Sequence, residues 1–356
     1  MVELAAKTVE PVLSTRLPRH RVAGLDSIRF VCAALVMLGH DGLLPGRLYG
    51  TGKTGISLVL VGLYNALFNS PAAVIVFFVV SGFCIHFPFT GNRVLSAMPF
   101  YVRRFIRIIP PALGSYLLLR SFKHYDVPLG DSLLWSIVCE MIYYFLYPAL
   151  LYLRRRSSWT VVLAVSYLAA ILVVVTHLDL LRTGSNSYIA LGWLTWVVGL
   201  PCWLLGCLLA ETCHSFRIPS PTAIWTARLG IFGLSVLLQL VRFHVHSILA
   251  SNCILLDLFA IPSFFWLAWE IAYASKHPPL RILEHAGRWS YSLYLVSPYT
   301  DVILASVGLA ALDRQPRTHF LIFGVSLALS YLYFLAVEWP SYRIALAASR
   351  RVAAVS

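Results

Sequence analysis

The chain is dominated by apolar runs of about 20 residues, the length of helix that crosses the hydrocarbon core of a bilayer. This feature limits the possible folds more than any other. Of the 356 residues, 59% are hydrophobic and only 12% are charged. A soluble domain carries roughly 25% charged residues. Because so little polar surface is available to cover a water-soluble fold, the sequence predicts an all-α, polytopic membrane protein.

Ten runs are candidate membrane spans, and a shorter apolar run lies between the first and the second. The ten candidates are 24–44, 72–90, 104–121, 132–153, 158–177, 189–210, 222–241, 252–274, 288–311 and 318–338. The third is the weakest because Arg107, two prolines and Arg120 interrupt it. The run at 56–68 is short and follows a Gly-rich loop, so we interpret it as an interfacial or re-entrant helix.

Basic residues are concentrated in alternate gaps between the runs, as topology determinants are. The gaps after the second, fourth and eighth runs and the C-terminal end are rich in arginine and lysine, and Arg154–Arg156 is the densest group. The other gaps are sparser, although Arg314 and Arg317 partly offset this bias. We therefore expect cytoplasmic tails at 1–23 and 341–356, with a transmembrane domain at 24–340.

Charge and cysteine usage exclude other classes. The formal net charge of +13 does not indicate nucleic acid, because the basic residues form no single long patch. Some of them are suited instead to anionic lipid or phosphate. The seven cysteines lie mostly in apolar runs without a CxxC pair, which favours buried thiols over disulfides or a metal site. The start of the chain lacks the cleavage site of a signal peptide.

The first run, "LDSIRFVCAALVMLGH" at 25–40, contains Arg29 and ends at His40. Ionisable groups inside hydrocarbon are costly and are usually functional. The two residues are 11 positions apart, so their side chains share one helix face about 16 Å apart along the axis. The simpler interpretations are a snorkelling Arg29 paired with Asp26, and an interfacial His40 beside Asp41.

A second costly group is Glu140, about eight residues into the fourth run and roughly 12 Å deep. An unpaired carboxylate there costs a few kcal/mol, so a partner or a water-filled cavity is expected. His40 would lie at a similar height, and the two side chains can meet if the first and fourth runs pack together. The alternative is a neutral Glu140 that forms hydrogen bonds between helices.

The segment "PFYVRRFIRIIPP" at 99–111 contains three arginines, Arg103, Arg104 and Arg107, which we call the arginine cluster. Arg103 and Arg107 are spaced i, i+4 on one helix face, with Arg104 beside them. Guanidinium groups in such a cluster suit phosphate. Anchoring at the cytoplasmic surface is the alternative, but it explains the depth of Arg107 less well. Four other acids in or beside apolar runs have no assigned role: Asp257, Glu270, Asp301 and Glu338.

Six stretches, in order along the chain, resemble motifs of the acyltransferase 3 family of bacterial integral-membrane O-acyltransferases. "LDSIRFVCAALVMLGH" is similar to the family's "LDxLRGxAAxxVxxxH", and "VFFVVSGFCI" (76–85) is similar to "FFxLSGFLI". "YVRRFIRIIPP" resembles "RRxxRIxP", and "LWSIVCEMIYY" resembles "WSLxxEEQFY". "SYSLYLVSP" (290–298) resembles "SYxLYLxH", and "VEWPSYR" (337–343) resembles "ExPxxR". The chain departs from the pattern at Met141, in place of a second acid, and at Ser297, in place of a histidine.

The resemblance implies an inner-membrane enzyme that moves an acyl group, usually acetyl, from acetyl-CoA to a hydroxyl of a glycan, a lipid-linked sugar or an exported small molecule. The arginine cluster would hold the nucleotide of the donor, and Arg29 would bind the donor or stabilise developing charge. His40 would act as a base or as a transient acyl carrier. Glu140 would orient or stabilise His40, or bind the acceptor. No metal is expected, and the sequence does not indicate the acceptor or an oligomeric state.

Two other functional classes use the same residues differently. A secondary transporter or exporter would use Arg29, His40 and Glu140 as a proton or substrate path. The sequence disfavours this because no pair of interrupted helices appears in matching positions of two halves. A catalytically inactive relative that acts as a sensor is disfavoured by the presence of all three residues.

Overall fold

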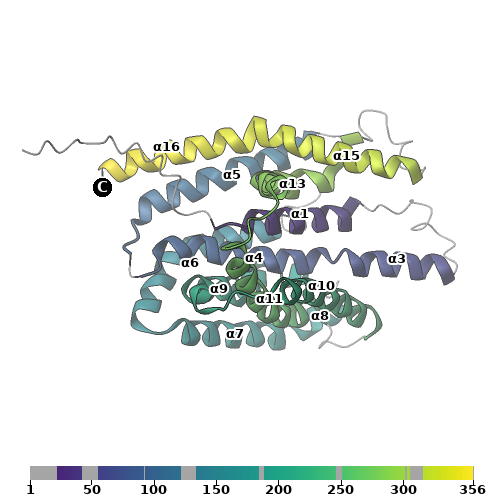
Figure 1. Cartoon of the computed structure of the whole chain (residues 1–356), viewed down its shortest axis with the longest axis horizontal. Helices are drawn as coiled ribbons and strands as arrows, with labels where there is room; N and C mark the ends of the chain where they lie inside the picture. The colour runs from purple at the N-terminus through teal and green to yellow at the C-terminus, as the bar shows by residue number, and fades with distance from the viewer. Residues whose placement is uncertain are drawn as a thin grey trace, which may run out of the picture.

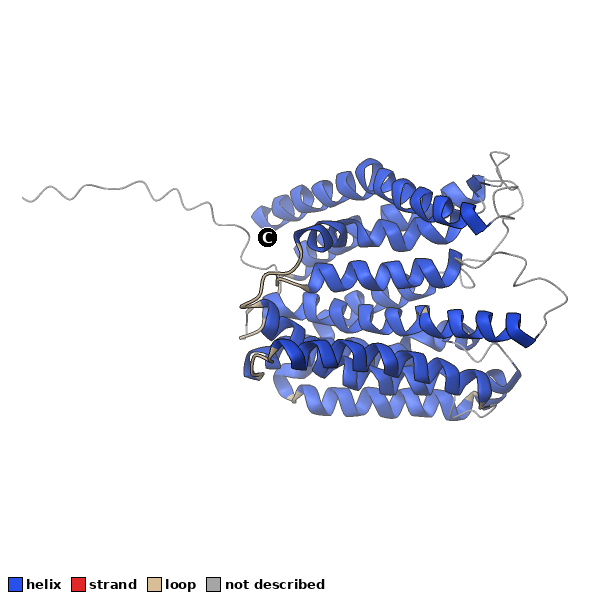
Figure 2. Ribbon diagram, turned by 45° about the vertical axis from the view of Figure 1, so that its right-hand side comes forward, coloured by secondary structure: helices blue, strands red, loops and turns tan. Residues whose placement is uncertain are grey.

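A computed structural model describes residues 22–41, 55–91, 93–121, 134–183, 188–245, 251–300, 303–304 and 316–355. Within these ranges the secondary structure is helical and contains no strand. Figure 2 shows that most of the long helices run roughly side by side. The α-helices are α1 (Leu25–Asp41), α3 (Gly55–Leu67), α4 (Ser70–His86), α5 (Ala97–Ser121), α6 (Trp135–Arg156), α7 (Trp159–Thr176), α8 (Leu178–Thr183), α9 (Thr195–Thr212), α10 (Pro221–His244), α11 (Asn252–Ala274), α12 (Arg281–Ala286), α13 (Ser290–Val296), α15 (Pro316–Tyr333) and α16 (Trp339–Val355).

Seven helical stretches in the described part of the chain are long and apolar enough to cross a membrane. They are Val59–Phe89, Trp135–Arg156, Trp159–Thr176, Ala190–Ser215, Pro221–His244, Asn252–Ala274 and Leu321–Ala354. They correspond to the second, the fourth to eighth and the tenth predicted runs. The first run forms α1, which has only 17 residues, and the third forms α5, which contains two prolines and several arginines. The all-helical membrane class is therefore confirmed. The count of ten spans stays a prediction, since part of the ninth run, 288–311, lies outside the described residues.

The run at 56–68 differs from the prediction. It forms α3, which lies end to end with α4 in Figure 1 and belongs to the same apolar stretch, Val59–Phe89. Asn69 stands at the junction: its side chain accepts a hydrogen bond from the Ala72 amide at 3.2 Å, which caps α4. Its Nδ2 donates to the Ser235 carbonyl of α10 at 2.8 Å. The short run therefore extends a spanning helix instead of forming a separate re-entrant one.

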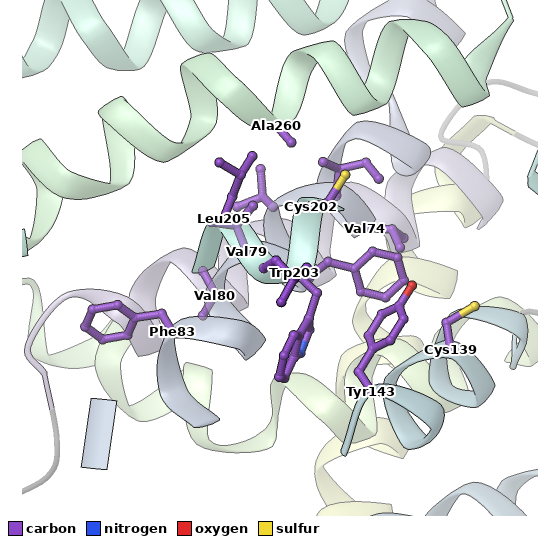
Figure 3. Close-up of a cluster of buried hydrophobic side chains, with 14 of the residues drawn as sticks. Val74, Val79, Val80, Phe83, Cys139, Tyr143, Cys202, Trp203, Leu205 and Ala260 are labelled. Carbon is purple, nitrogen blue, oxygen red and sulfur yellow. The ribbon is translucent and has the colours of Figure 1, made fainter. Parts of the chain in front are cut away.

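Helix α4 is the centre of the bundle, and most of its residues are buried. It packs against α1, α9 and α11. Its approach to α9 is close because both helices present a glycine: a Cβ at Gly82 would lie 1.9 Å from the Trp203 carbonyl oxygen, and one at Gly206 would lie 2.0 Å from that of Val79. Figure 3 shows Val79 and Phe83 of α4 in the same cluster as Trp203 of α9.

A partly buried ionic cluster joins the ends of α4, α6, α7 and α9, and we call it the Glu211 cluster. The Glu211 carboxylate accepts hydrogen bonds from Arg154 Nη2 at 2.8 Å and from Trp159 Nε1 at 2.9 Å. Nε2 of His86 lies 3.0 Å from the same carboxylate, and its Nδ1 lies 2.9 Å from the Tyr147 hydroxyl. Arg154 belongs to the arginine run that the sequence indicated as a topology signal, so this residue also has a structural partner.

The C-terminal residues form one long helix. A five-residue π-helical turn, η8 (Phe334–Glu338), joins α15 to α16, which continues to Val355 and packs along α5 (Figure 1). Pro110 lacks the N–H that would bind the Ile106 carbonyl, and the Ser341 hydroxyl of α16 donates to that carbonyl instead. Residues 341–355, which the sequence predicts as a tail, are therefore helical and packed.

Candidate active site

A cavity of about 120 Å³ lies between α1, α4, α5, α6 and the Ser290–Tyr294 part of α13, and we call it the site cavity. Arg29, Arg104, Arg107 and Glu140 line it together. Four of the six predicted site residues, from three helices far apart in the sequence, thus face one space. The other polar side chains that line it are Ser81, Cys84, Ser136, Tyr144, Ser290, Tyr291 and Tyr294.

Arg29 comes from the second turn of α1. Its Nη1 lies 3.7 Å from Asp26 Oδ1, one turn earlier, so the simple pairing suggested by the sequence is present. The side chain also faces the site cavity, where its charge interacts with Glu140 and Glu338. Arg29 is therefore a cavity residue as well as the partner of Asp26.

Glu140 is held by two hydroxyl groups. Ser81 Oγ of α4 donates to Glu140 Oε1 at 2.6 Å, and the Tyr144 hydroxyl, one turn along α6, donates to the same oxygen. Trp203 Nε1 donates to Ser81 Oγ at 3.3 Å, so a third helix supports this arrangement. A carboxylate that accepts two hydroxyl donors is fixed in position without being neutralised by a cation.

The arginine cluster divides into cavity and surface residues. Arg104 and Arg107, spaced i, i+3, line the site cavity, while Arg103 is exposed. The guanidinium of Arg104 lies 5.9 Å from the ring centres of Phe100 and Tyr144. Among the described residues its Nε is buried without a hydrogen-bond partner. A buried donor in this state is costly, and an anion in the cavity would satisfy it.

His40 occupies a different place from these residues. It lies in the last turn of α1, is exposed, and is not among the described residues that line the site cavity. The approach of His40 to Glu140 stays a prediction; α1 packs chiefly against α4 and the segment from α12 to α13. The sequence therefore places Arg29 and His40 on one helix, but only Arg29 reaches the cavity.

Glu338 does not line the site cavity but contacts α13, one of the helices around it. It is 3% exposed, lies in the π-helical turn η8, and accepts hydrogen bonds from the Ser292 amide at 3.0 Å and from the Ser292 hydroxyl. Its charge interacts with those of Arg107 and Arg29. π-Helical turns are frequent at functional sites. This acid had no role assigned from the sequence, and its position suggests that it balances part of the arginine charge.

Two of the other unassigned acids, Glu270 and Asp257, do not line the site cavity. Glu270 forms a bidentate ion pair with Arg228, at 2.7 and 2.8 Å. Asp257 accepts a hydrogen bond from the Cys202 thiol at 3.3 Å. Asp301 lies outside the described residues. Within the described ranges, no three His, Cys, Asp or Glu side chains come together as metal ligands.

The sequence reasoning missed the hydroxyl groups of the cavity. Ser81 and Tyr144 hold Glu140, and Tyr291 binds the Ile108 carbonyl of α5 at 3.0 Å. The available signal was the motifs themselves: Ser81 belongs to "SGFCI", and Tyr291 and Tyr294 belong to "SYSLYLVSP". Motifs that are widely separated in the sequence thus line one space.

The fold and the site together define an all-helical membrane protein with an arginine-lined cavity between its helices. A family model described as an acyltransferase domain, that of the acyltransferase 3 family, matches residues 22–337. Because the match covers most of the chain, the protein belongs to this family, which confirms the resemblance found in the motifs. No curated protein and no solved structure matches the chain. The protein is a multi-pass membrane acyltransferase.

Proposed function

We propose that the protein transfers an acyl group, acetyl in the simplest case, from coenzyme A to a hydroxyl of a glycan, a lipid-linked sugar or an exported small molecule. The observation that supports this function is the convergence of Arg29, Arg104, Arg107 and Glu140 on the site cavity. Three cations opposite one carboxylate, with an unsatisfied guanidinium nitrogen, favour an anionic ligand such as a phosphorylated donor.

The size of the site cavity suggests how the donor binds. Ligand pockets for whole drug-sized molecules measure roughly 300–1,000 Å³, whereas this cavity measures about 120 Å³. It therefore suits one part of the donor: we assign the phosphates to Arg104 and Arg107, with Arg29 beside them, and the nucleotide to the outside, near the exposed Arg103. The thioester arm would then extend along α1 toward His40.

The transfer itself needs one base and one leaving group. The acceptor oxygen attacks the thioester carbonyl while the base removes its proton, and the C–S bond breaks to release coenzyme A, whose thiolate takes up a proton. We assign the base to His40, either directly or with His40 as a transient acyl carrier, and we assign to Glu140 the orientation of the acceptor. Since His40 lies about 16 Å along α1 from Arg29, the donor would enter from the arginine end and the acceptor from the His40 end.

Binding and turnover can be separated by variants of the full-length protein in lipid nanodiscs. We expect Arg104→Ala combined with Arg107→Ala to weaken acetyl-CoA binding, measured by calorimetry, by about 100-fold or more, because charge-assisted hydrogen bonds contribute about 1.5–3 kcal/mol each. Arg103→Ala is the matched control and should change the affinity by less than about 5-fold.

His40→Ala should retain acetyl-CoA binding and lose acyl transfer, measured as the release of coenzyme A in the presence of cell-surface glycans or exported metabolites. Normal turnover of this variant would remove His40 from the mechanism. Absence of acetyl-CoA binding by the unmodified protein would overturn the assignment of the donor.

A further inference from the structure

A second and larger cavity, of about 610 Å³, lies on the opposite side of α1 and α4 from the site cavity. We call it the lateral groove. Along α1 it is lined by Ile28, Val31, Cys32 and Leu35, whereas Arg29, on another face of the same helix, lines the site cavity. Figure 1 shows α10 and α11, which form its other walls, on one side of α4, with α5 and α16 on the opposite side.

The length of the lateral groove matches one leaflet of a bilayer. Its lining extends from Gly24 to Leu35 on α1 and from Trp225 to Ser235 on α10. At 1.5 Å per residue, these segments measure about 15–16 Å, about half of the roughly 30 Å hydrocarbon core. The groove begins near the N-terminus of α1 and therefore runs inward from one membrane surface.

The walls of the groove are apolar, and their charges are neutralised internally. Arg228 and Glu270 both line it, but they form a bidentate ion pair, and Trp266 Nε1 donates to Glu270 at 2.9 Å. Arg228 also lies over the ring of Trp225, at 4.7 Å. An uncharged apolar channel in a membrane-spanning bundle suits a hydrocarbon chain, since the paired groups need no ionic ligand.

The mouth of the groove, unlike its apolar walls, has basic residues beside it. His277, Pro278, Pro279 and Leu280 line it, in the connection between α11 and α12. The exposed cations Lys276 and Arg281 flank this segment. Leu280 and Ile282 beside them are 68% and 76% exposed, as expected for apolar side chains that contact a bilayer. Positive charge at the edge of an apolar channel complements the phosphate of a lipid headgroup.

We propose that the lateral groove binds one anionic glycerophospholipid, with an acyl chain between α1, α4, α10 and α11 and its phosphate beside Lys276 and Arg281. The bound chain packs against the face of α1 opposite the site cavity. The proposal does not depend on acyl transfer, because its test measures bound lipid.

The first test fills the groove. The full-length protein is purified in detergent, and its retained lipid is identified and counted by native mass spectrometry. We expect one phospholipid per chain in the unmodified protein and at least about 5-fold less in Ile231→Trp, whose indole would occupy the channel. Leu237→Trp is the matched control, since Leu237 lies on the same helix, is 54% exposed and does not line the groove. It should retain lipid as the unmodified protein does.

The second test reverses the charge at the mouth. Lys276→Glu with Arg281→Glu should lower the preference for phosphatidylglycerol over phosphatidylcholine by about 10-fold or more, because each basic residue near the membrane surface contributes about 1 kcal/mol. Arg350→Glu with Arg351→Glu changes the net charge equally on α16 and should leave the preference unchanged.

Three outcomes would overturn the proposal. They are equal lipid retention by Ile231→Trp and Leu237→Trp, a retained molecule that is an isoprenoid phosphate, and a lipid preference that both charge reversals change equally.

Discussion

The site cavity and the Glu211 cluster both place ionisable side chains between helices, but they satisfy them in opposite ways. In the Glu211 cluster, one carboxylate receives hydrogen bonds from an arginine and a tryptophan and contacts a histidine. In the site cavity, three arginines face one carboxylate whose Oε1 is bound by hydroxyl groups, and Arg104 Nε is buried without a partner in the described residues. The Glu211 cluster satisfies its own groups, whereas Arg104 Nε in the site cavity is the kind of unsatisfied donor that we expect a ligand to bind.

The strongest test of this difference removes the central carboxylate of the Glu211 cluster. Glu211→Ala leaves Arg154, His86 and Trp159 without the carboxylate that they share. Hydrogen bonds to a charged group contribute about 1.5–3 kcal/mol each, and less where the pair is partly exposed to solvent. We expect a large loss of folded protein, measured by size-exclusion chromatography and thermal unfolding in detergent. Glu211→Gln is the companion variant and should recover part of the loss, since it still accepts hydrogen bonds. Unfolding temperatures equal to that of the unmodified protein would contradict the structural role.

Removing a charged group from the site cavity should leave the stability of the protein nearly unchanged or increase it. Arg104→Leu removes a guanidinium whose Nε has no partner, so the free energy of unfolding without ligand should stay within about 1 kcal/mol of the original or increase. Acetyl-CoA should then stabilise this variant less than it stabilises the unmodified protein. The measurement is thermal unfolding with and without acetyl-CoA. A loss of stability as large as that of Glu211→Ala would show that Arg104 is a structural residue.

The smallest expected effect tests how the Glu211 cluster distributes its interactions. Trp159→Phe removes one donor to Glu211 and part of a buried ring, while Arg154 remains, so we expect a loss of about 1–2 kcal/mol in the free energy of unfolding. Acetyl-CoA affinity should be unaffected, because Trp159 does not line the site cavity. Thermal unfolding and calorimetry on the same preparation measure both quantities.

The helical fold was largely predictable from the sequence. Each apolar residue adds to the free-energy cost of exposing the chain to water, so long apolar runs reveal membrane helices. Continuity between helices was less predictable. The residues at the junction of α3 and α4 are typical of a helix boundary: Asn69, Ser70 and Pro71. Asn69 does cap α4, but α3 ends only two residues earlier, so the two helices form one apolar stretch. The three arginines near the C-terminus, Arg343, Arg350 and Arg351, indicated a cytoplasmic tail. A pattern of charges does not show that α16 also packs on α5.

The candidate site was predictable where a residue was costly by itself. Arg29, Glu140 and the arginine cluster were found because charges are rare in apolar runs. The choice between Arg103 and Arg104 as the partner of Arg107 was not predictable, since spacings of three and four residues both share a helix face and packing against α6 and α13 decides. The hydroxyl groups of Ser81 and Tyr144 gave no signal by composition, because such residues are ordinary in membrane helices.

The packing of α16 on α5 also bears on where the enzyme can be shortened. The family match ends at residue 337, a few positions before Ser341. The Ser341 hydroxyl donates to the Ile106 carbonyl, which has no N–H partner at Pro110. A chain cut at the family boundary would thus expose a bare backbone acceptor one residue from Arg107, in the helix that carries the arginine cluster. We therefore expect a chain that ends at residue 337 to be less stable than one that keeps α16.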